Sequence, residues 1–171
     1  MIAIFSDTHS NDGHELTGEA LEAARSANTV IHAGDFTSTA ALEAFHRECD
    51  RLLAVHGNAD SATVRERLPT ARVVEADGAR FAVTHRREGG ATGLAMFGRS
   101  RDADVVVSGH THRPTVVETD DVVLLNPGSH AQPRGNRPGF AVLERDGDEL
   151  VGELCQPDGA VLETISVRMT R

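Results

Sequence analysis

Short apolar runs and helical segments alternate along the first two thirds of the chain. The apolar runs are rich in Val, Ile, Leu and Ala, and each ends at a glycine or a polar residue; they cover residues 2–5, 29–33, 52–56, 80–84 and 105–107. A short apolar run bounded in this way is typical of a buried strand. Strands that alternate with helices predict a parallel sheet with helices on its faces.

The segments between these runs carry helix signals. Apolar residues recur at helical spacing from about residue 14 to 27, which predicts a helix whose alanine-rich face packs on the sheet. Further helices are expected after an N-cap at Ser38 or Thr39, after one at Asp60 or Ser61 with its end before Pro69, and from Gly89-Gly90.

The pattern changes after residue 112. Strand-like segments now follow one another directly, with turn residues such as Asp146-Gly147 between them, so this part predicts antiparallel pairing. The segments are 115–118, 122–125, 140–144, 149–155 and 161–169, and a similar short strand at 73–75 precedes a turn at Asp77-Gly78. Because no linker or low-complexity tract interrupts the chain, we expect a single α/β domain over residues 1–171 with two sheets.

The length and the cysteine content narrow the class of protein. A chain of 171 residues buries about 70% of its extended-chain surface on folding, so no disulfide or metal is needed to hold it together. Residues 1–5 are apolar but lack a basic region and soon meet Asp7, which argues against a signal peptide or a membrane span. Cys49 and Cys155 are expected to be free, buried thiols, and the location cytoplasmic.

The charge composition is unusual because all 17 basic residues are Arg, in a chain with a net charge of −9. An acidic chain without Lys is typical of salt adaptation, although a GC-rich genome alone would also favour Arg over Lys. The acidity argues against nucleic acid as a partner. At 1 M salt, however, the Debye length is only ~3 Å, so the net charge then has little influence on which partners the chain binds.

Potential metal ligands stand at the ends of the apolar runs. In an extended segment the side chains of residues i and i+2 point the same way, so the pair His110 and His112 can reach one point in space. His-x-His alone is equally compatible with two exposed loop histidines. The ends of parallel strands gather at one edge of a sheet, and the candidates there are Asp7, His9, Asp35, Asn58, His85, His110 and His112.

Three oxygen and four nitrogen ligands exceed what one ion needs and suit two adjacent divalent ions that share a carboxylate. Mixed imidazole and carboxylate ligation suits Mn, Fe, Co, Ni or Zn better than Ca or Mg. Two such ions, when they lie roughly 3.5–4 Å apart, can hold the attacking and leaving oxygens of an in-line displacement at phosphorus.

The motifs Asp7-Thr8-His9, Gly34-Asp35, Gly57-Asn58, His85 and Gly109-His110-Thr111-His112 resemble, in this order, those of the calcineurin-like metallophosphoesterase superfamily. The short chain and the stretch Asn126-Pro127-Gly128-Ser129 resemble its small phosphodiesterase branch, the YfcE-like proteins. The resemblance implies a four-layer sandwich of two mixed β-sheets flanked by helices, with a dinuclear metal site at the carboxyl ends of the strands.

The same resemblance implies a role for each ligand. Asp7, His9 and His112 would hold one ion, Asn58, His85 and His110 the other, with Asp35 as the bridge. Asp35, Asn58 and His110 would then act in catalysis through the metals, and a metal-bound hydroxide would be the nucleophile. The implied cofactors are two divalent metal ions, of which Mn is the most favoured. The implied substrate is a small phosphodiester or a nucleotide-like compound.

Two positions depart from the family pattern. Ala59 stands where many members have a histidine that assists the leaving group, so the general acid is not identified; either the metals and a good leaving group suffice, or His130 or Arg134 substitutes. Arg86 stands where relatives commonly have glycine and, with Arg87, could contact a phosphate or crowd the pocket. The candidate substrate contacts are therefore Arg86, His130 and Arg134.

Some polar residues have a purely structural interpretation. His32 and His56 precede strand-end glycines and are expected to be packed or rim histidines, and Asp60 is expected to cap a helix. Ala59 also leaves open a second function, a binding scaffold like the metallophosphoesterase-like subunit of the retromer coat. We expect a small phosphoester as the binding partner and no interaction with a membrane. The sequence leaves open whether the chain forms a homo-oligomer.

Overall fold

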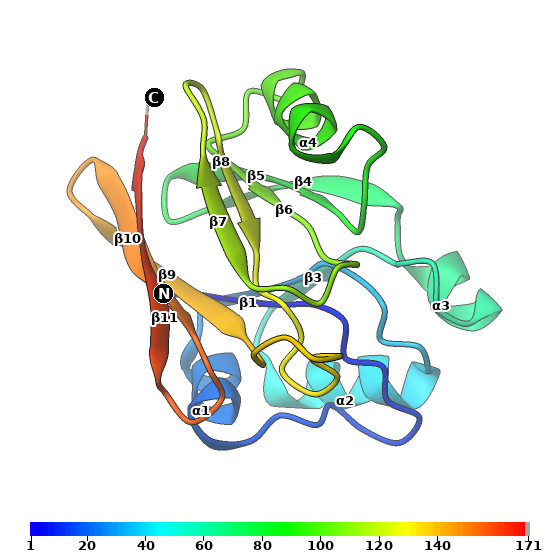
Figure 1. The fold of residues 1–171 in the computed structure, drawn as a ribbon. Coiled ribbons are helices and arrows are strands. Elements are labelled where there is room, and N and C mark those ends of the chain that lie inside the picture. Colours follow the sequence, from blue (N-terminus) through cyan, green and yellow to red (C-terminus); the bar gives the residue numbers. More distant parts are fainter. Residues whose placement is uncertain (170–171) are drawn as a thin grey trace.

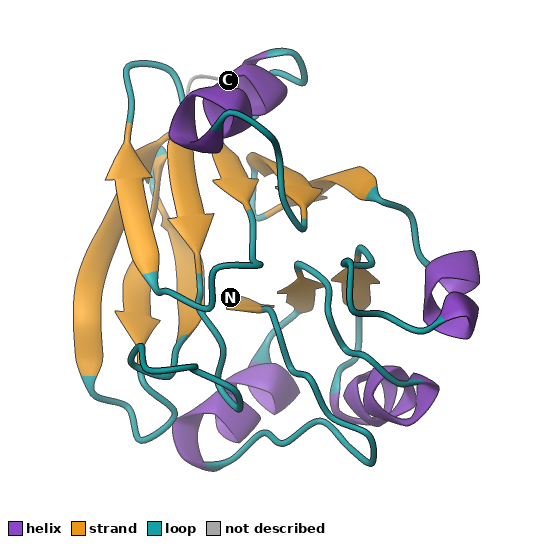
Figure 2. Cartoon of the chain, turned by 45° about the vertical axis from the view of Figure 1, so that its right-hand side comes forward, coloured by secondary structure: helices purple, strands orange, loops and turns teal. Residues whose placement is uncertain are grey.

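A computed structural model describes residues 1–169 and shows two mixed β-sheets packed face to face between helices (Figures 1 and 2). The first sheet has the strand order β11-β10-β9-β1-β2-β3, and the second has the order β4-β5-β6-β8-β7. β1, β2 and β3 pair in parallel, as do β5, β6 and β8, whereas the other neighbours are antiparallel.

The strands of the first sheet are β1 (Ile2–Phe5), β2 (Thr29–His32), β3 (Leu52–Ala54), β9 (Phe140–Asp146), β10 (Glu149–Cys155) and β11 (Val161–Arg168). Those of the second sheet are β4 (Ala71–Ala76), β5 (Ala79–Thr84), β6 (Val105–Val107), β7 (Thr115–Glu118) and β8 (Val123–Asn126). The helices are α1 (Gly18–Ser26), α2 (Thr39–Glu48), α3 (Ala62–Arg67) and α4 (Gly90–Arg99).

Alternation along β1 shows how the layers are built. Ile2 and Ile4 point into the core between the two sheets, where they join residues of both sheets such as Phe81. Ala3 and Phe5 point the other way, into the layer formed with α1 and α2. On the far side, α4 packs on the outer face of the second sheet (Figure 1). The four-layer α/β sandwich implied by the family resemblance is thus confirmed.

Two of the predicted N-caps are observed. Ser38 Oγ accepts the backbone N–H of Ala41 at the start of α2, and Ser61 Oγ accepts that of Val64 at the start of α3. The helix predicted from residue 14 begins only at Gly18. Glu15 and Gly18 have φ values of 55° and 52°, and this left-handed backbone cannot continue a right-handed helix.

The register of the parallel strands determines the edge of the sandwich at which the predicted ligands meet. β1 and β2 end together, with Phe5 paired to His32, and Val83 in β5 is paired to Val107 in β6. Loops that leave these carboxyl ends therefore emerge at one edge of the sandwich. Within residues 1–169, no helix has the length and apolar character needed to cross a membrane.

Candidate metal centre

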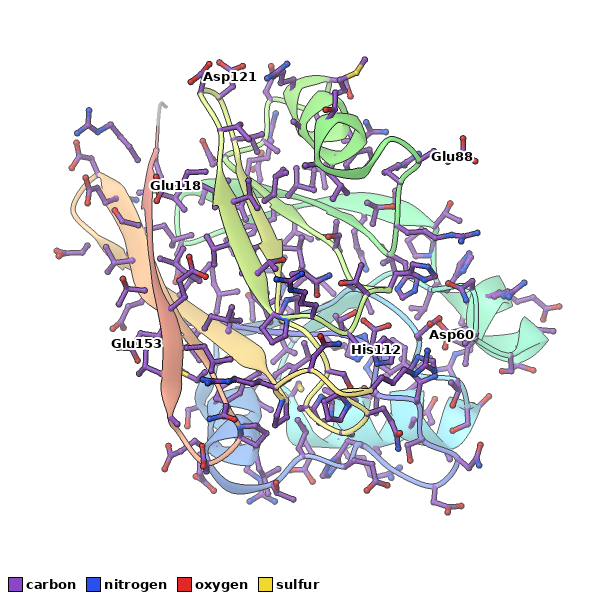
Figure 3. All side chains as sticks on the ribbon, in the orientation of Figure 1. Asp60, Glu88, His112, Glu118, Asp121 and Glu153 are labelled. Atoms are coloured by element: carbon purple, nitrogen blue, oxygen red, sulfur yellow. The ribbon has the colours of Figure 1, made fainter. Side chains whose placement is uncertain are left out.

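The loops after five strands bring the predicted ligands to this edge. Asp7 and His9 follow β1, Asp35 follows β2, Asn58 follows β3, His85 follows β5, and His110 and His112 follow β6 (Figure 3 labels His112). Five of the seven have a positive φ, between 44° for His9 and 72° for His110. Non-glycine residues pay roughly 1–3 kcal/mol each for this conformation, so the surrounding contacts must enforce it.

Backbone hydrogen bonds between the two first loops supply part of that enforcement. The N–H of Asp7 donates to Gly34 O at 2.9 Å, and the N–H of His9 donates to Asp35 O at 3.0 Å. The loop after β1 thus lies in register with the loop after β2, and the two carboxylates face the same space.

The Asp7 carboxylate contacts the protein mainly through Oδ2 and faces the imidazoles with Oδ1, which also accepts the His110 N–H at 3.2 Å. Oδ2 accepts the hydroxyl of Ser6 at 2.7 Å and the backbone N–H of His110 at 3.0 Å. Oδ1 lies 3.3 Å from Nε2 of His112, 3.8 Å from that of His9 and 3.9 Å from that of His85.

The Asp35 carboxylate follows the same plan. Oδ1 accepts the backbone N–H of Ala59 at 2.8 Å. Oδ2 lies 3.3 Å from His9 Nε2 and 3.1 Å from His85 Nε2. Each carboxylate therefore presents one oxygen to the point where the imidazole nitrogens converge.

The imidazoles are oriented by carbonyl groups behind them. His85 Nδ1–H donates to Ala33 O at 2.8 Å, and His112 Nδ1–H donates to Gln132 O. Because a carbonyl can only accept, Nδ1 carries the proton of each neutral ring, and the Nε2 lone pair then points toward the carboxylates, as in metal-ligating histidines. Nε2 of His9 and of His85 is buried and makes no hydrogen bond of normal geometry, so a cation fits this donor set.

In the described part of the chain, two groups of ligand atoms could each hold a metal ion: Asp7, His9 and His112, and Asp7, Asp35 and His85. Within each group these atoms lie within 4.8 Å of one another. The first group matches the set that the resemblance implied for one ion. Asp7 belongs to both groups, and Asp35 also reaches His9, so both carboxylates join the two halves of the centre.

Asn58 and His110 stand beside these two groups. Asn58 is exposed and lines a cavity together with His85. The His110 ring is exposed and packs edge-on to the His85 ring, with centroids 5.4 Å apart. Both residues therefore lie next to His85, the neighbour that the resemblance gave them.

Charged groups and burial shift the pKa values of several side chains in the centre. The nearby carboxylates of Asp35 and then Asp7 raise the pKa of His9 to about 9, against the effect of burial. Burial works to raise the pKa of Asp35, but His85 and His9 outweigh it and hold that pKa below its usual value. For His110, burial and then the nearby His85 and Arg86 lower the pKa. A divalent cation at this centre would displace protons.

Asp60 does not cap a helix, which corrects the sequence prediction; Ser61 is the cap of α3. The Asp60 carboxylate instead accepts three backbone N–H groups, from Asp35 at 2.9 Å, Thr37 at 2.7 Å and Gly57 at 2.7 Å. It therefore ties the Asp35 loop to the Gly57-Asn58 loop. Sequence reasoning missed this role, because a carboxylate before a helix resembles a cap.

Glycines allow the loops to approach the carboxylates. A Cβ at position 57 would overlap Asp35 Oδ1, and one at position 109 would overlap Ser6 Oγ and crowd Asp7 Oδ2. Only a residue without a side chain fits at either place.

His32 is a core histidine, as the sequence predicted. It is fully buried and stacks on Phe36 with ring centroids 3.7 Å apart. Its Nδ1 accepts the N–H of Gly34, and its Nε2 lies 2.8 Å from Thr8 Oγ1. His32 therefore links the loop after β1 to the loop after β2.

His130 is also in the core, which corrects its expected place at the rim as a substrate contact. It is 7% exposed, packs edge-on against Phe5 and Phe45, and donates through Nε2–H to His14 O. The aromatic layer keeps it from the pocket. Arg134 is exposed on the loop before β9 and lines neither cavity that adjoins the ligands.

Arg86 and Arg87 stand between two cavities that open beside the predicted ligands. One, of about 410 Å³, is also lined by Asn58, Arg65 and His85. The other, of about 260 Å³, also has His110 and Leu94 in its wall. His56 is partly buried and lines the larger cavity, in keeping with the rim position expected for it.

Comparison with known proteins agrees with the geometry. The model of the calcineurin-like phosphoesterase superfamily domain matches residues 1–148. A probable metallophosphoesterase of Methanothermobacter thermautotrophicus is 34% identical over 176 residues, which cover 98% of this chain and 99% of the relative. A phosphodiesterase of Methanocaldococcus jannaschii is 31% identical, covering 86% and 95%. The Escherichia coli phosphodiesterase YfcE is 29% identical, covering 61% and 58%.

Solved structures show the same fold. Vps29 of Entamoeba histolytica, in a structure complexed with zinc, has a TM-score of 0.78 at 22% identity and covers 96% of this chain and 98% of its own. Vps29 of Chaetomium thermophilum has a TM-score of 0.79 at 20% identity, covering 98% and 96%. At these identities the likeness concerns the fold alone.

Proposed function

The chain belongs to the calcineurin-like phosphoesterase superfamily, within its YfcE-like small phosphodiesterase branch, and from this premise we propose that it is a divalent-metal-dependent phosphodiesterase. Its substrate in this proposal is a small phosphodiester or a nucleotide-like compound. The observation that carries it is the convergence of two carboxylate oxygens on buried imidazole nitrogens that lack hydrogen-bond partners.

Two ions per chain fit the donor set in this proposal. The groups around His112 and His85 share Asp7, and the site offers oxygen and nitrogen ligands without sulfur. This chemistry favours Mn, which we propose first, or Ni, Fe, Co or Zn. When bound, such ions lower the pKa of a bound water and offset charge on the phosphoryl oxygens.

The residues of the chain have distinct tasks in this mechanism. Asp35 faces both halves of the centre, and Asn58 and His110 complete the half around His85. Arg86 adjoins both His85 and His110, so its guanidinium lies beside the centre, where it can bind a phosphate oxygen of the substrate. Position 59 supplies only a backbone N–H, to Asp35, and no acid, so we expect a good leaving group to be required.

Turnover of bis-p-nitrophenyl phosphate with added Mn²⁺ or Ni²⁺ tests the proposal. We expect Asp35→Ala and His110→Ala to lower turnover by roughly 10²-fold or more, because each removes charge or ligation at the ions. Asp50→Ala, an exposed aspartate after α2, is the control and should retain the rate. Metal-independent turnover, or unchanged rates in both site variants, would refute the proposal.

A binding scaffold is the second candidate, since Vps29 structures share the fold and position 59 lacks an acid. A scaffold does not need two loaded metal positions. Less than one tightly bound ion per chain, together with no turnover, would favour it over the enzyme. Cytoplasmic location, salt adaptation, a homo-oligomer and a substrate contact at Arg134 stay predictions.

A further inference from the structure

The larger cavity beside the metal centre is rich in arginine. Arg65 from α3 and Arg86 and Arg87 from the loop after β5 line it, together with the ligands Asn58 and His85. Among residues 1–169, no carboxylate lines it, although the chain carries 26 acidic residues against 17 basic ones. The cavity is therefore a positive region in an acidic protein.

These three arginines lack the carboxylate partner that four other arginines of residues 1–169 have. Arg25, Arg67, Arg80 and Arg99 each lie within 4.0 Å of a carboxylate. Among the ion pairs of residues 1–169, none involves Arg65, Arg86 or Arg87. Their charge is not neutralised by an ion pair with this chain and is available to a ligand.

Two of the three guanidiniums are already held in place. Arg65 donates to the backbone carbonyl of Asn58, so it is fixed at the loop that carries a predicted ligand. Arg87 lies over the ring of Phe97, 4.2 Å from the centroid. Glu88 follows Arg87 in the chain, but Figure 3 shows its side chain pointing away from the labelled His112. Ordered arginines lose less entropy when they bind an anion.

The size of the cavity shows that it can hold more than the reacting group. Its volume of about 410 Å³ lies in the usual range for small-molecule pockets, about 300–1,000 Å³. Asn58 and His85 form the wall next to the metal centre, whereas Arg65 and Thr70 extend the lining to α3 and to the start of β4. A phosphoryl group at the metals would leave the arginine-lined part free.

We propose that this cavity binds a second phosphate-like anion, carried by the same substrate molecule as the scissile phosphoester. The inference rests on the proposed function for the position of the scissile group. It narrows the substrate class to phosphoesters with a further phosphate a few bonds away, because planar guanidiniums bind phosphate oxygens in pairs.

Calorimetric binding to the Mn²⁺-loaded protein tests this, with thymidine 5′-phosphate and thymidine 3′,5′-bisphosphate as a matched pair of probes. We expect the bisphosphate to bind at least about tenfold more tightly at constant ionic strength. Arg65→Gln and Arg86→Gln should each remove most of this preference. Arg168→Gln, an exposed arginine on β11 far from the cavity, should keep it.

Inorganic phosphate added together with thymidine 5′-phosphate shows whether the second anion must be covalently attached to the same ligand molecule. If it strengthens binding of the monophosphate as much as the second phosphate does, the cavity takes a free anion and the proposal is wrong. Equal affinities for the two probes, or a preference that survives both arginine variants in protein whose unfolding temperature is unchanged, would also overturn it.

Turnover of bis-p-nitrophenyl phosphate in the same preparations separates this inference from the proposed function. Turnover without a bisphosphate preference refutes only the anion cavity. A bisphosphate preference lost in Arg65→Gln, without any turnover, supports the cavity and refutes the phosphodiesterase.

Discussion

His85 and His130 are both buried, with 3% and 7% exposure, yet they lie in opposite environments. His85 faces Asp7 and Asp35 in the metal centre, and its Nε2 has no normal hydrogen bond. His130 lies in the aromatic layer beneath, against Phe5 and Phe45. Burial alone therefore does not distinguish a candidate metal ligand from a core histidine, whereas the charged groups that the ring faces do.

The pKa values follow this difference. Burial works to lower the pKa of His85, but Asp35 and Asp7 raise it above its usual value. Burial lowers the pKa of His130 to about 4, and the carbonyl of His14 only partly opposes this. A ring in front of carboxylates favours a positive charge, whether a proton or a metal ion supplies it, whereas the ring in the aromatic layer excludes charge.

The largest effect is expected within the metal centre. His85→Ala and His112→Ala remove one ligand each from different groups, so each variant should lose one of two bound Mn²⁺ ions, and turnover should fall by roughly 10²–10³-fold. Equilibrium dialysis and turnover measure both. Because the groups differ in composition, the remaining ion should bind with a different affinity in each variant. Identical titration curves would argue against two separate positions.

A smaller effect is expected from His130, as loss of stability in acid. Its folded pKa of about 4 lies below the unfolded value of about 6.5, so the unfolded chain binds the proton first. The free energy of unfolding should thus fall by up to ~3 kcal/mol as the pH falls from about 6.5 to about 4. Asp7, His14 and Glu15 are the other charged or titratable groups that act on this ring, and the buried His32 titrates in the same sense.

Denaturant unfolding of wild type and His130→Gln across this pH range measures the contribution. The variant should be less stable at pH 7, because its side chain packs less well against Phe5 and Phe45, but its stability should depend less on pH. If both proteins lose the same free energy between pH 6.5 and 4, His130 does not resist protonation in the core.

The contrast between the two histidines also marks the limit of the sequence. His85 directly follows a predicted strand, and parallel strands bring their carboxyl ends together, so its grouping with Asp7 and Asp35 could be predicted. His130 stands in the loop between β8 and β9, where no periodicity assigns a side chain to the core or the rim. Its burial follows from the aromatic layer, which only the folded chain assembles.

The arginine cavity and the role of Asp60 show a second limit. Arg65 is seven residues from Asn58 along the chain but meets Arg86 only because α3 and the loop after β5 lie at the same edge. The three N–H groups bound by Asp60 come from two different loops. Local patterns predict elements and their ends, whereas such contacts depend on how the loops cross.

The smallest effect is expected for Asp60. The neighbouring variants Asp60→Asn and Ser61→Ala form a matched pair that tests whether Asp60 supports the metal centre or only the start of α3. Both Asp60 oxygens accept backbone N–H groups, so in Asp60→Asn an amide NH₂ must face at least one such donor. The Asp35 and Gly57 loops should then shift, and Mn²⁺ affinity should fall roughly 10–100-fold, as for other residues that support metal ligands. Ser61→Ala removes the cap of α3, a long bond of 3.4 Å, so it should cost less than about 1 kcal/mol of stability and leave Mn²⁺ affinity unchanged. Calorimetric Mn²⁺ titration and thermal unfolding of the two variants measure these effects. Equal losses of metal affinity in both would mean that Asp60 acts only through the start of α3.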